Sequence, residues 1–289
     1  MSGPDRDLHE RNRAAWNLAT DAHNSHKGDQ ATFYRAGGHK LYPEEIELLG
    51  DIAGKRVLHL QCNAGQDTLS LAQLGASAVG VDISDSAIEF ARNLSAESGV
   101  QAEFHRADVY DWLQDAAARG EQFDIVFSSY GAVIWLSDLK SWARGIASLV
   151  RPGGRFVVVD FHPVSLALDD DWTLRFPYSS FGEAAEYVVW SDGVGDYVAL
   201  EMQQSNPDAE IPGVKDFVNP HPSYEFAWGM ADILSAFLNA GMRITEVREY
   251  PYSNSGHIPG MKLNEEGKWV PPEGLPKLPL MYGIVATRP

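Results

Sequence analysis

The residues best suited to chemistry lie in one stretch, Lys55–Asp82, which reads KRVLHLQCNAGQDTLSLAQLGASAVGVD. A first apolar run leads into a small-residue turn, Asn63–Gly65, and a second apolar run ends on an acid, Asp82. A tight turn brings backbone N–H groups close to a ligand, and a carboxylate at the tip of the next strand accepts ribose hydroxyls. The stretch therefore predicts a strand–turn–helix–strand unit that holds a ribose-bearing cofactor, and Asp82 alone leaves the identity of that cofactor open.

Further polar residues follow two later strands. Ser128–Gly131 comes at the end of the run 123–128, and His162 directly follows the run 155–161. Open α/β sheets bind ligands beyond the carboxyl ends of their strands, so both segments are expected at the ligand edge. Imidazole titrates near neutrality, which makes His162 a candidate base for an acceptor hydroxyl or amine; a structural, hydrogen-bonded histidine is the alternative. His221 is a second candidate of the same kind.

The elements that position these residues alternate between strand and helix from residue 55 to residue 161. This alternation predicts an α/β fold with a parallel, doubly wound, Rossmann-like sheet and right-handed crossovers. Asp67 is expected to cap the first helix, Ser84–Ser86 offers N-cap residues for the second, and Ser86 with Glu89 has capping-box spacing. The later predicted elements are strands at 101–106, 123–128 and 155–161, helices at 111–119, 138–149 and 228–240, a turn at 151–154, and two final strands at 243–250 and 281–287.

The segments outside this alternation suggest a lid and an insertion. Residues 1–30 are polar with few apolar anchors, so 1–53 is interpreted as an N-terminal helical lid with a short helix between Pro43 and Gly50. Residues 162–225 mix aromatics with prolines, glycines and acids in short strand-like pieces. This composition predicts either a wall for an apolar or aromatic small molecule or an accessory sheet that dimerises. Residues 251–280 are predicted to form a loop.

Composition excludes several partners. A formal charge of −17 disfavours nucleic acid and anionic membranes, because neutralising phosphates needs clustered Lys and Arg. The apolar stretches are far shorter than the roughly 20 residues that span a bilayer. A single cysteine, Cys62, rules out an internal disulfide and fits a reducing, cytoplasmic location. No metal-ligand set is evident, and the sequence leaves open whether the chain forms a homo-oligomer.

The order of these parts resembles the class I S-adenosylmethionine-dependent methyltransferases of the small-molecule type, over 55–161 and again over 226–289. The family's acid-x-Gly-x-Gly-x-Gly turn falls on His59–Gly65, where only the last glycine is kept. Its second-strand acid falls on Asp82 and its third-strand acid on Asp108. Leu149–Val159, LVRPGGRFVVV, is similar to the family's turn into the fifth strand. The resemblance implies a seven-stranded sheet that closes with an antiparallel hairpin.

The resemblance also implies roles for residues of the cofactor site. Asp82 would bind the ribose, Ile83 would lie against the adenine, and Asp108, with Val109 beside it, would take the adenine amino group. Asn63, which tolerates positive φ better than other non-glycine residues, can replace a lost glycine. The other cofactor-binding candidates are His59, Gln61, Gly65, Ser128 and Tyr34.

The expected function is therefore transfer of a methyl group from S-adenosylmethionine to an oxygen, nitrogen or carbon atom of a small molecule. His162 is the candidate base, and Trp135, His221 and Tyr130 are the candidate substrate-binding residues. The insertion 162–225 would bind the substrate or dimerise, while 54–161 and 226–289 would bind the cofactor. Two alternatives remain, an NAD-dependent oxidoreductase and a non-catalytic or repurposed S-adenosylmethionine-binding protein.

Overall fold

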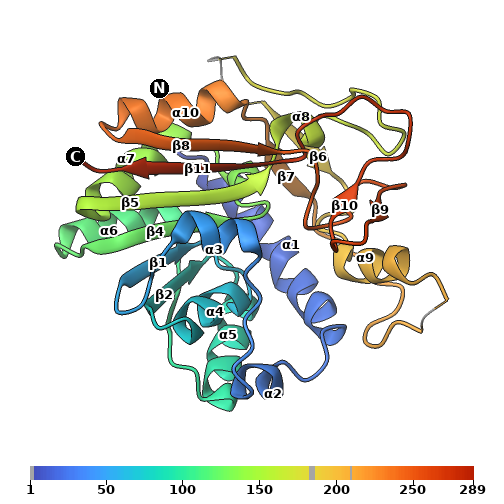
Figure 1. Ribbon diagram of the computed structural model, residues 1–289, viewed down its shortest axis with the longest axis horizontal. Helices are drawn as coiled ribbons and strands as arrows, with labels where there is room; N and C mark the ends of the chain where they lie inside the picture. The colour runs from blue at the N-terminus through green and yellow to red at the C-terminus, as the bar shows by residue number, and fades with distance from the viewer. Residues whose placement is uncertain (1–2, 182–185, 209) are drawn as a thin grey trace.

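The fold is built on one central sheet of seven strands in the order β3-β2-β1-β4-β5-β11-β8 (Figure 1). The computed structural model describes residues 3–181, 186–208 and 210–289. β1 to β5 run parallel, and β11 runs antiparallel to both β5 and β8, which confirms the predicted Rossmann-like sheet with a closing hairpin. The strands are β1 (Arg56–Leu60), β2 (Ser77–Asp82), β3 (Glu103–Arg106), β4 (Phe123–Ser129), β5 (Val150–Phe161), β8 (Arg243–Tyr250) and β11 (Met281–Thr287).

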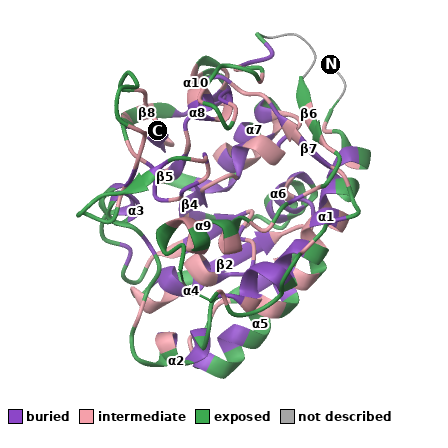
Figure 2. Cartoon of the chain, turned by 90° about the vertical axis from the view of Figure 1, so that its right-hand side faces the viewer, coloured by how far each residue is buried: buried purple, intermediate pink, exposed green. Residues whose placement is uncertain are grey.

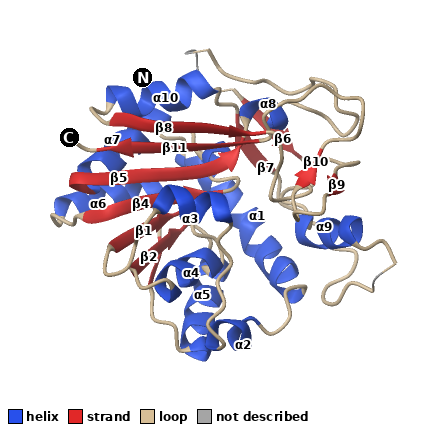
Figure 3. Cartoon of the chain, viewed as in Figure 1, coloured by secondary structure: helices blue, strands red, loops and turns tan. Residues whose placement is uncertain are grey.

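Helices cover both faces of this sheet (Figure 3). Alternation along the strands decides which side chain meets which layer. In β4, Val126 packs into the cluster that contains Trp142 and Phe237, whereas Phe127 packs into the opposite cluster with Leu49 and Leu71. One layer comprises α3 (Pro43–Leu49), α4 (Gln66–Gln73) and α5 (Asp85–Ser98); the other comprises α6 (Val109–Ala118), α7 (Leu139–Leu149) and α10 (Met230–Asn239).

Helix boundaries differ from the predicted ones where a cap was assigned to the wrong residue. Of the candidates Ser84–Ser86, Ser84 caps α5, because its side chain accepts a hydrogen bond from the Ala87 amide; Ser86, which had capping-box spacing, lies inside the helix. Gly65 occupies the N-cap of α4, which leaves Asp67 inside the first turn. β5 begins at Val150, so the predicted turn at 151–154 lies within the strand.

The N-terminal segment forms a longer and more buried helix than the sequence suggested. α1 (Arg6–Ser25) buries nine residues, and apart from Leu8 these are alanines or polar side chains. Asn12 shows how such a face packs, because its amide donates to the Tyr224 carbonyl and accepts from the Tyr224 amide. The short helix α2 (Gln30–Arg35) follows and rests on α5.

The segments at the carboxyl ends of the parallel strands hold the remaining elements. β6 (Tyr187–Trp190) pairs with β7 (Ser223–Phe226), and β9 (Lys262–Leu263) pairs with β10 (Trp269–Val270). The helix α9 (Tyr197–Ser205) was not predicted; Asp196 caps it, and none of its residues is fully buried. Figure 2 looks onto this side of the molecule and shows α9 in front of the sheet. The remaining short helices are η1 (Val133–Trp135) and α8 (Pro163–Leu166).

Within the described residues, none of the helices combines the length and the apolar character that a bilayer crossing requires.

His23 of α1 provides a test of how this helix packs. Its Nε2 donates to the Gly195 carbonyl at 2.8 Å, while its buried Nδ1 has no partner among the described residues. Burial lowers the pKa of His23 from 6.5 to about 4. Because the folded pKa is the lower one, the stability that neutral His23 contributes is present above pH 6.5 and is lost as the pH falls toward 4, by at most about 3 kcal/mol.

We expect His23→Gln to flatten the pH dependence of the free energy of unfolding between pH 6.5 and 4, as measured by urea denaturation at a series of pH values. His221→Gln, which changes an exposed histidine, serves as the control and should keep the wild-type slope. Equal slopes for wild type and His23→Gln would contradict the packing described for α1.

Candidate functional site

The turn after β1 has the left-handed backbone that a glycine-rich turn would have. Gln61, Asn63 and Gly65 have φ of +54°, +48° and +78°. The Asn63 side chain supports this geometry, because its Oδ1 accepts from the next amide, that of Ala64, at 2.6 Å. The prediction that Asn63 replaces a glycine is confirmed for the backbone.

Asp82 at the tip of β2 ties this turn to the following helix. Its Oδ2 accepts from the Asn63 amide at 2.8 Å, and its Oδ1 accepts from the Ser84 amide at 2.9 Å. Burial raises the pKa of this carboxyl group, and the two backbone donors oppose that rise. Each oxygen keeps a lone pair for a ligand hydroxyl.

Asp108 is both the N-cap of α6 and the partner of α1. It accepts from the Tyr110 amide at 2.8 Å and from His9 Nδ1 at 2.7 Å, and it forms an ion pair with Arg6. Burial raises the pKa of Asp108, but the hydrogen bond and charge of His9, together with Arg6, hold it below its usual value. The His9 ring stacks on Tyr110, so the first turns of α1 close this end of the site.

The end of β4 is held by a buried carboxylate on β5. Asp160 accepts from the amides of Gly131, Ala132 and Val133, at 2.5, 3.2 and 3.1 Å. The Ala132 carbonyl in turn accepts from Gln61 Nε2 at 2.6 Å, which connects this loop to the turn after β1. Gln61 Oε1 is buried and has no partner among the described residues. Hydrogen bonds therefore hold the loop 130–133 in place, whereas Gln61 Oε1 beside it has no hydrogen-bond partner among the described residues.

These segments open onto one cavity of about 980 Å³. Two lysines, Lys27 and Lys40, line it near Asp67, whose pKa is raised by burial against the opposing effects of both lysines and of Ser129. A further part of the wall comes from 134–135, 161–200 and 254–258 and combines aromatic and apolar side chains with the acids Asp169, Asp170, Asp192 and Asp196. Its members include Trp135, Phe161, Leu166, Phe176, Trp190, Tyr197, Leu200 and His257, and Glu201 and Glu225 line the cavity beside them.

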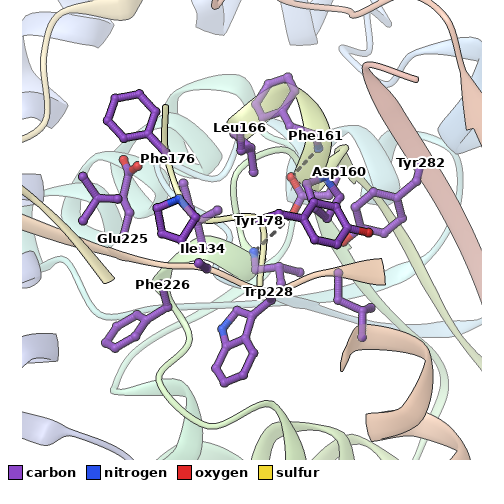
Figure 4. Close-up of a pocket in the computed structure, with 16 residues that line it drawn as sticks. Ile134, Asp160, Phe161, Leu166, Phe176, Tyr178, Glu225, Phe226, Trp228 and Tyr282 are labelled. Carbon is purple, nitrogen blue, oxygen red and sulfur yellow. Dashed lines mark hydrogen bonds between the residues drawn. The ribbon is translucent and has the colours of Figure 1, made fainter. Parts of the chain in front are cut away.

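A second, smaller pocket of about 40 Å³ lies against the first and shares part of its wall, including Ile134, Phe176 and Glu225. Figure 4 shows Phe226 and Trp228 on one side of it, opposite Leu166 and Phe176. It extends the aromatic wall toward Asp160, Trp228 and Tyr282, which also line this pocket.

The cavity brings together nine of the predicted site residues. They are His59, Gln61, Asn63, Asp82, Ile83, Asp108, Val109, Tyr130 and Trp135.

Three predicted cofactor residues do not line the cavity. Tyr34 is buried and donates to the Gln66 carbonyl at 2.6 Å, so it anchors α2 on α4. Gly65 faces the core instead, where an added Cβ would lie 2.6 Å from that of Ala91. Ser128 is fully buried, and its neighbour Ser129 lines the cavity in its place.

Two predicted histidines are also absent from the cavity wall. His162 caps α8: its Nδ1 accepts from the Val164 amide at 3.1 Å, and its Nε2 contacts Glu249 at 3.0 Å. With both nitrogens engaged outside the cavity, we no longer assign His162 as a base. His221 is exposed and lies outside both cavities.

Sequence reasoning missed several lining residues. Asp67 had been assigned to a helix cap, and Lys27 and Lys40 belong to the segment interpreted only as a lid. His257 and Asn254 lie in the loop 251–280, which has no periodic pattern from which a role could be inferred. Among the described residues, no group of three or more His, Cys, Asp or Glu side chains is arranged to hold a metal ion.

Comparison with known proteins agrees with this geometry. Residues 57–154 match the family described as the methyltransferase domain. The ubiquinone biosynthesis O-methyltransferase of Bordetella avium is 34% identical over 108 residues, which cover 37% of this chain and 43% of that protein. The Xanthomonas euvesicatoria protein of the same name is 29% identical over 171 residues, covering 54% of this chain and 70% of the other. The chain spans about half the length of the first curated relatives it matches.

Solved structures share the fold across most of the chain. The CcbJ methyltransferase from Streptomyces caelestis aligns with a TM-score of 0.56 at 13% identity, covering 96% of this chain and 98% of that one. A structure described as a putative S-adenosylmethionine-dependent methyltransferase from Listeria monocytogenes aligns with a TM-score of 0.53 at 19% identity, covering 85% and 96%. Residues 57–154 are thus similar to a methyltransferase domain, and the chain shares the fold of these two methyltransferase structures.

Proposed function

We propose that the protein transfers the methyl group of S-adenosylmethionine to a small aromatic molecule. The observation that supports this most strongly is the continuity of the cavity. A single space joins the turn at 61–63 and Asp82 to the aromatic wall around Phe176 and Trp190. Donor and acceptor would therefore meet inside one enclosure, as an in-line transfer requires.

The residues present fit the cofactor. Asp82 has lone pairs available for the ribose hydroxyls, and Lys27 and Lys40 would pair with the amino-acid carboxylate while Asp67 would pair with its ammonium group. The buried, unsatisfied Gln61 Oε1 would gain a hydrogen-bond donor from a bound polar ligand. When bound, S-adenosylmethionine supplies an electrophilic sulfonium methyl group.

The chain's own contribution is positioning and exclusion of water. Asp160 fixes the loop 131–133 through backbone hydrogen bonds, so the wall at the end of β4 does not need to reorganise when ligands bind. Aromatic side chains such as Trp135 and Phe161 keep the transfer site dry. The relatives' names specify O-methylation, which supports an oxygen nucleophile on the acceptor.

We infer a corresponding division of the chain. Residues 54–161 and 226–289 would hold the cofactor, and 162–225 would line the acceptor part. Residues 1–53 would act as a lid, because Arg6 and His9 of α1 contact Asp108 at the adenine end. Asp108 was expected to take the adenine amino group, but its carboxylate already contacts Arg6 and His9 of the proposed lid.

Asp82→Asn should weaken binding of S-adenosylhomocysteine by roughly tenfold to a hundredfold in isothermal titration calorimetry. A hydrogen bond to a charged group is worth about 1.5–3 kcal/mol, and the substitution removes the charge that the ribose hydroxyls meet. Asp115→Asn changes an exposed acid on α6 outside the cavity and is the matched control.

Thermal melts of both variants separate a lost contact from a lost fold. If the wild-type protein binds NADH and does not bind S-adenosylhomocysteine, the proposal is wrong and an oxidoreductase is favoured.

The double variant Lys27→Met, Lys40→Met should weaken S-adenosylhomocysteine binding by roughly fivefold, because exposed ion pairs each contribute less than about 1 kcal/mol. The same variant should bind 5′-methylthioadenosine as wild type does, since that molecule lacks the amino-acid carboxylate. Equal losses for the two ligands would show that the lysines do not bind the amino-acid end.

A further inference from the structure

The small pocket beside the large cavity has a wall that no step described so far uses. Its volume is about 40 Å³, which is room for a group of a few non-hydrogen atoms. Glu225 and Phe176 line both spaces, so the two adjoin at these side chains. Six of the side chains that line the pocket are aromatic (Figure 4); they are Phe161, Phe176, Tyr178, Phe226, Trp228 and Tyr282.

Backbone hydrogen bonds hold two of these rings in place. Trp228 Nε1 donates to the Leu136 carbonyl at 2.6 Å, and the Tyr178 hydroxyl accepts from the Met230 amide at 3.2 Å. Their polar atoms are engaged by the backbone, so these two side chains contribute mainly ring surface to the pocket.

Glu225 brings a carboxylate to the place where the two spaces adjoin. It lies on β7 directly opposite Val188 of β6, which lines the same pocket, and residues opposite each other in an antiparallel pair share a face of the sheet. Its neighbour Tyr224 packs with Leu8 of α1 instead. Burial raises the pKa of the Glu225 carboxyl group, so a cation beside it would stabilise its charged form.

Tyr282 adds a buried hydroxyl group that has no hydrogen-bond partner among the described residues. The side chain is 1% exposed and lies opposite Asp160 in the β11–β5 pair. Asp160 already accepts from four backbone amides, those of residues 131–133 and of Phe161. A buried polar group without a partner is unfavourable, so a ligand that donates to the Tyr282 hydroxyl would recover that free energy.

The charges around the pocket have one sign. Asp160 and Glu225 line it, and among the described residues of its wall there is no lysine, arginine or histidine. Arg175 and His26 pair with two of the acids in the adjoining part of the large cavity, and the two lysines of that cavity lie near Asp67. The acids of the adjoining part are Asp169, Asp170, Asp192, Asp196 and Glu201. Such an excess of negative charge attracts cations and disfavours anionic ligands.

We propose that the small pocket binds a protonated amine of the acceptor, and that the acceptor is therefore an arylalkyl amine. The inference rests on the proposed methyl transfer and names the class of its acceptor. The ammonium group donates to Glu225 and to the Tyr282 hydroxyl, and its charge lies against the rings of Phe176 and Trp228. The body of the acceptor stays in the large cavity, where it meets the methyl donor.

The test compares three probes that share a phenyl ring and differ in charge: 2-phenylethylamine, 2-phenylethanol and 3-phenylpropanoate. Each is titrated at pH 7 into protein loaded with S-adenosylhomocysteine, and binding is measured by calorimetry. Wild type should bind the amine roughly tenfold more tightly than the alcohol, because hydrogen bonds to charged groups are the stronger ones. The anion should bind most weakly.

Glu225→Gln keeps the size of the side chain and removes its charge. It should lower the affinity for the amine by roughly tenfold and the affinity for the alcohol by less than about twofold. Glu89→Gln removes the same charge from an exposed position on α5 outside both spaces, so it is the matched control and should bind all three probes as wild type does.

Tyr282→Phe is a second, independent variant. It should lower the affinity for the amine by roughly threefold to tenfold without lowering the melting temperature, because the hydroxyl has no partner in the unliganded protein among the described residues. Thermal melts of all variants report whether each is folded.

Equal affinities of the wild type for the amine and the alcohol would overturn the assignment. So would an amine preference that Glu225→Gln leaves unchanged, because the amine would then bind elsewhere. The binding of S-adenosylhomocysteine is measured first. Intact cofactor binding without an amine preference would contradict this inference alone, whereas absence of cofactor binding would show that the proposed function is wrong and, with it, the role of the amine as acceptor.

Discussion

The site depends on one half-buried carboxylate that holds two amides. Asp82 accepts from Asn63 and from Ser84, and these two amides belong to the turn after β1 and to the start of α5. The turn has lost two of the glycines that would make positive φ easy, so its geometry relies on this carboxylate and on the Asn63 side chain. Once the turn is fixed, Gln61 reaches across to the Ala132 carbonyl and sets the distance between two walls of the cavity. A cofactor site can thus be preserved after its glycines are replaced, provided that neighbouring acceptors hold the backbone.

The rest of the cavity is built from segments added at the sheet's carboxyl edge. Figure 1 shows β6, β7, α9 and the β9–β10 pair gathered on that side, far apart in sequence from the N-terminal helix that joins them. α1 contacts the core at Asp108 and the insertion at Gly195 and Tyr224. One helix therefore contacts both the Asp108 end of the cavity and the segment 162–225.

The sequence predicted the sheet well, because its strands are apolar runs separated by clear stop residues. The strands 243–250 and 281–287 and the parallel, doubly wound sheet followed from the sequence pattern, whereas the antiparallel closing hairpin followed from the family resemblance. α1 was underestimated because its buried face consists of alanine and polar residues, whose burial depends on partners such as Tyr224 that a local pattern does not show. His162 illustrates the opposite error. Its position after β5 was predicted correctly, but the direction of its side chain depends on α8 and Glu249. His257 lies in a loop without periodicity, so only the folded chain reveals its place in the cavity.

We propose that the Asp82 turn holds the ribose of S-adenosylmethionine at one end of a cavity whose other end takes the acceptor. A crystal structure with S-adenosylhomocysteine would test this arrangement. We expect both ribose hydroxyls within hydrogen-bonding distance, about 3 Å, of the Asp82 carboxylate, with the sulfur facing the aromatic wall that includes Phe161 and His257. A ligand bound elsewhere, or bound here with its ribose away from Asp82, would show that the proposed arrangement is wrong.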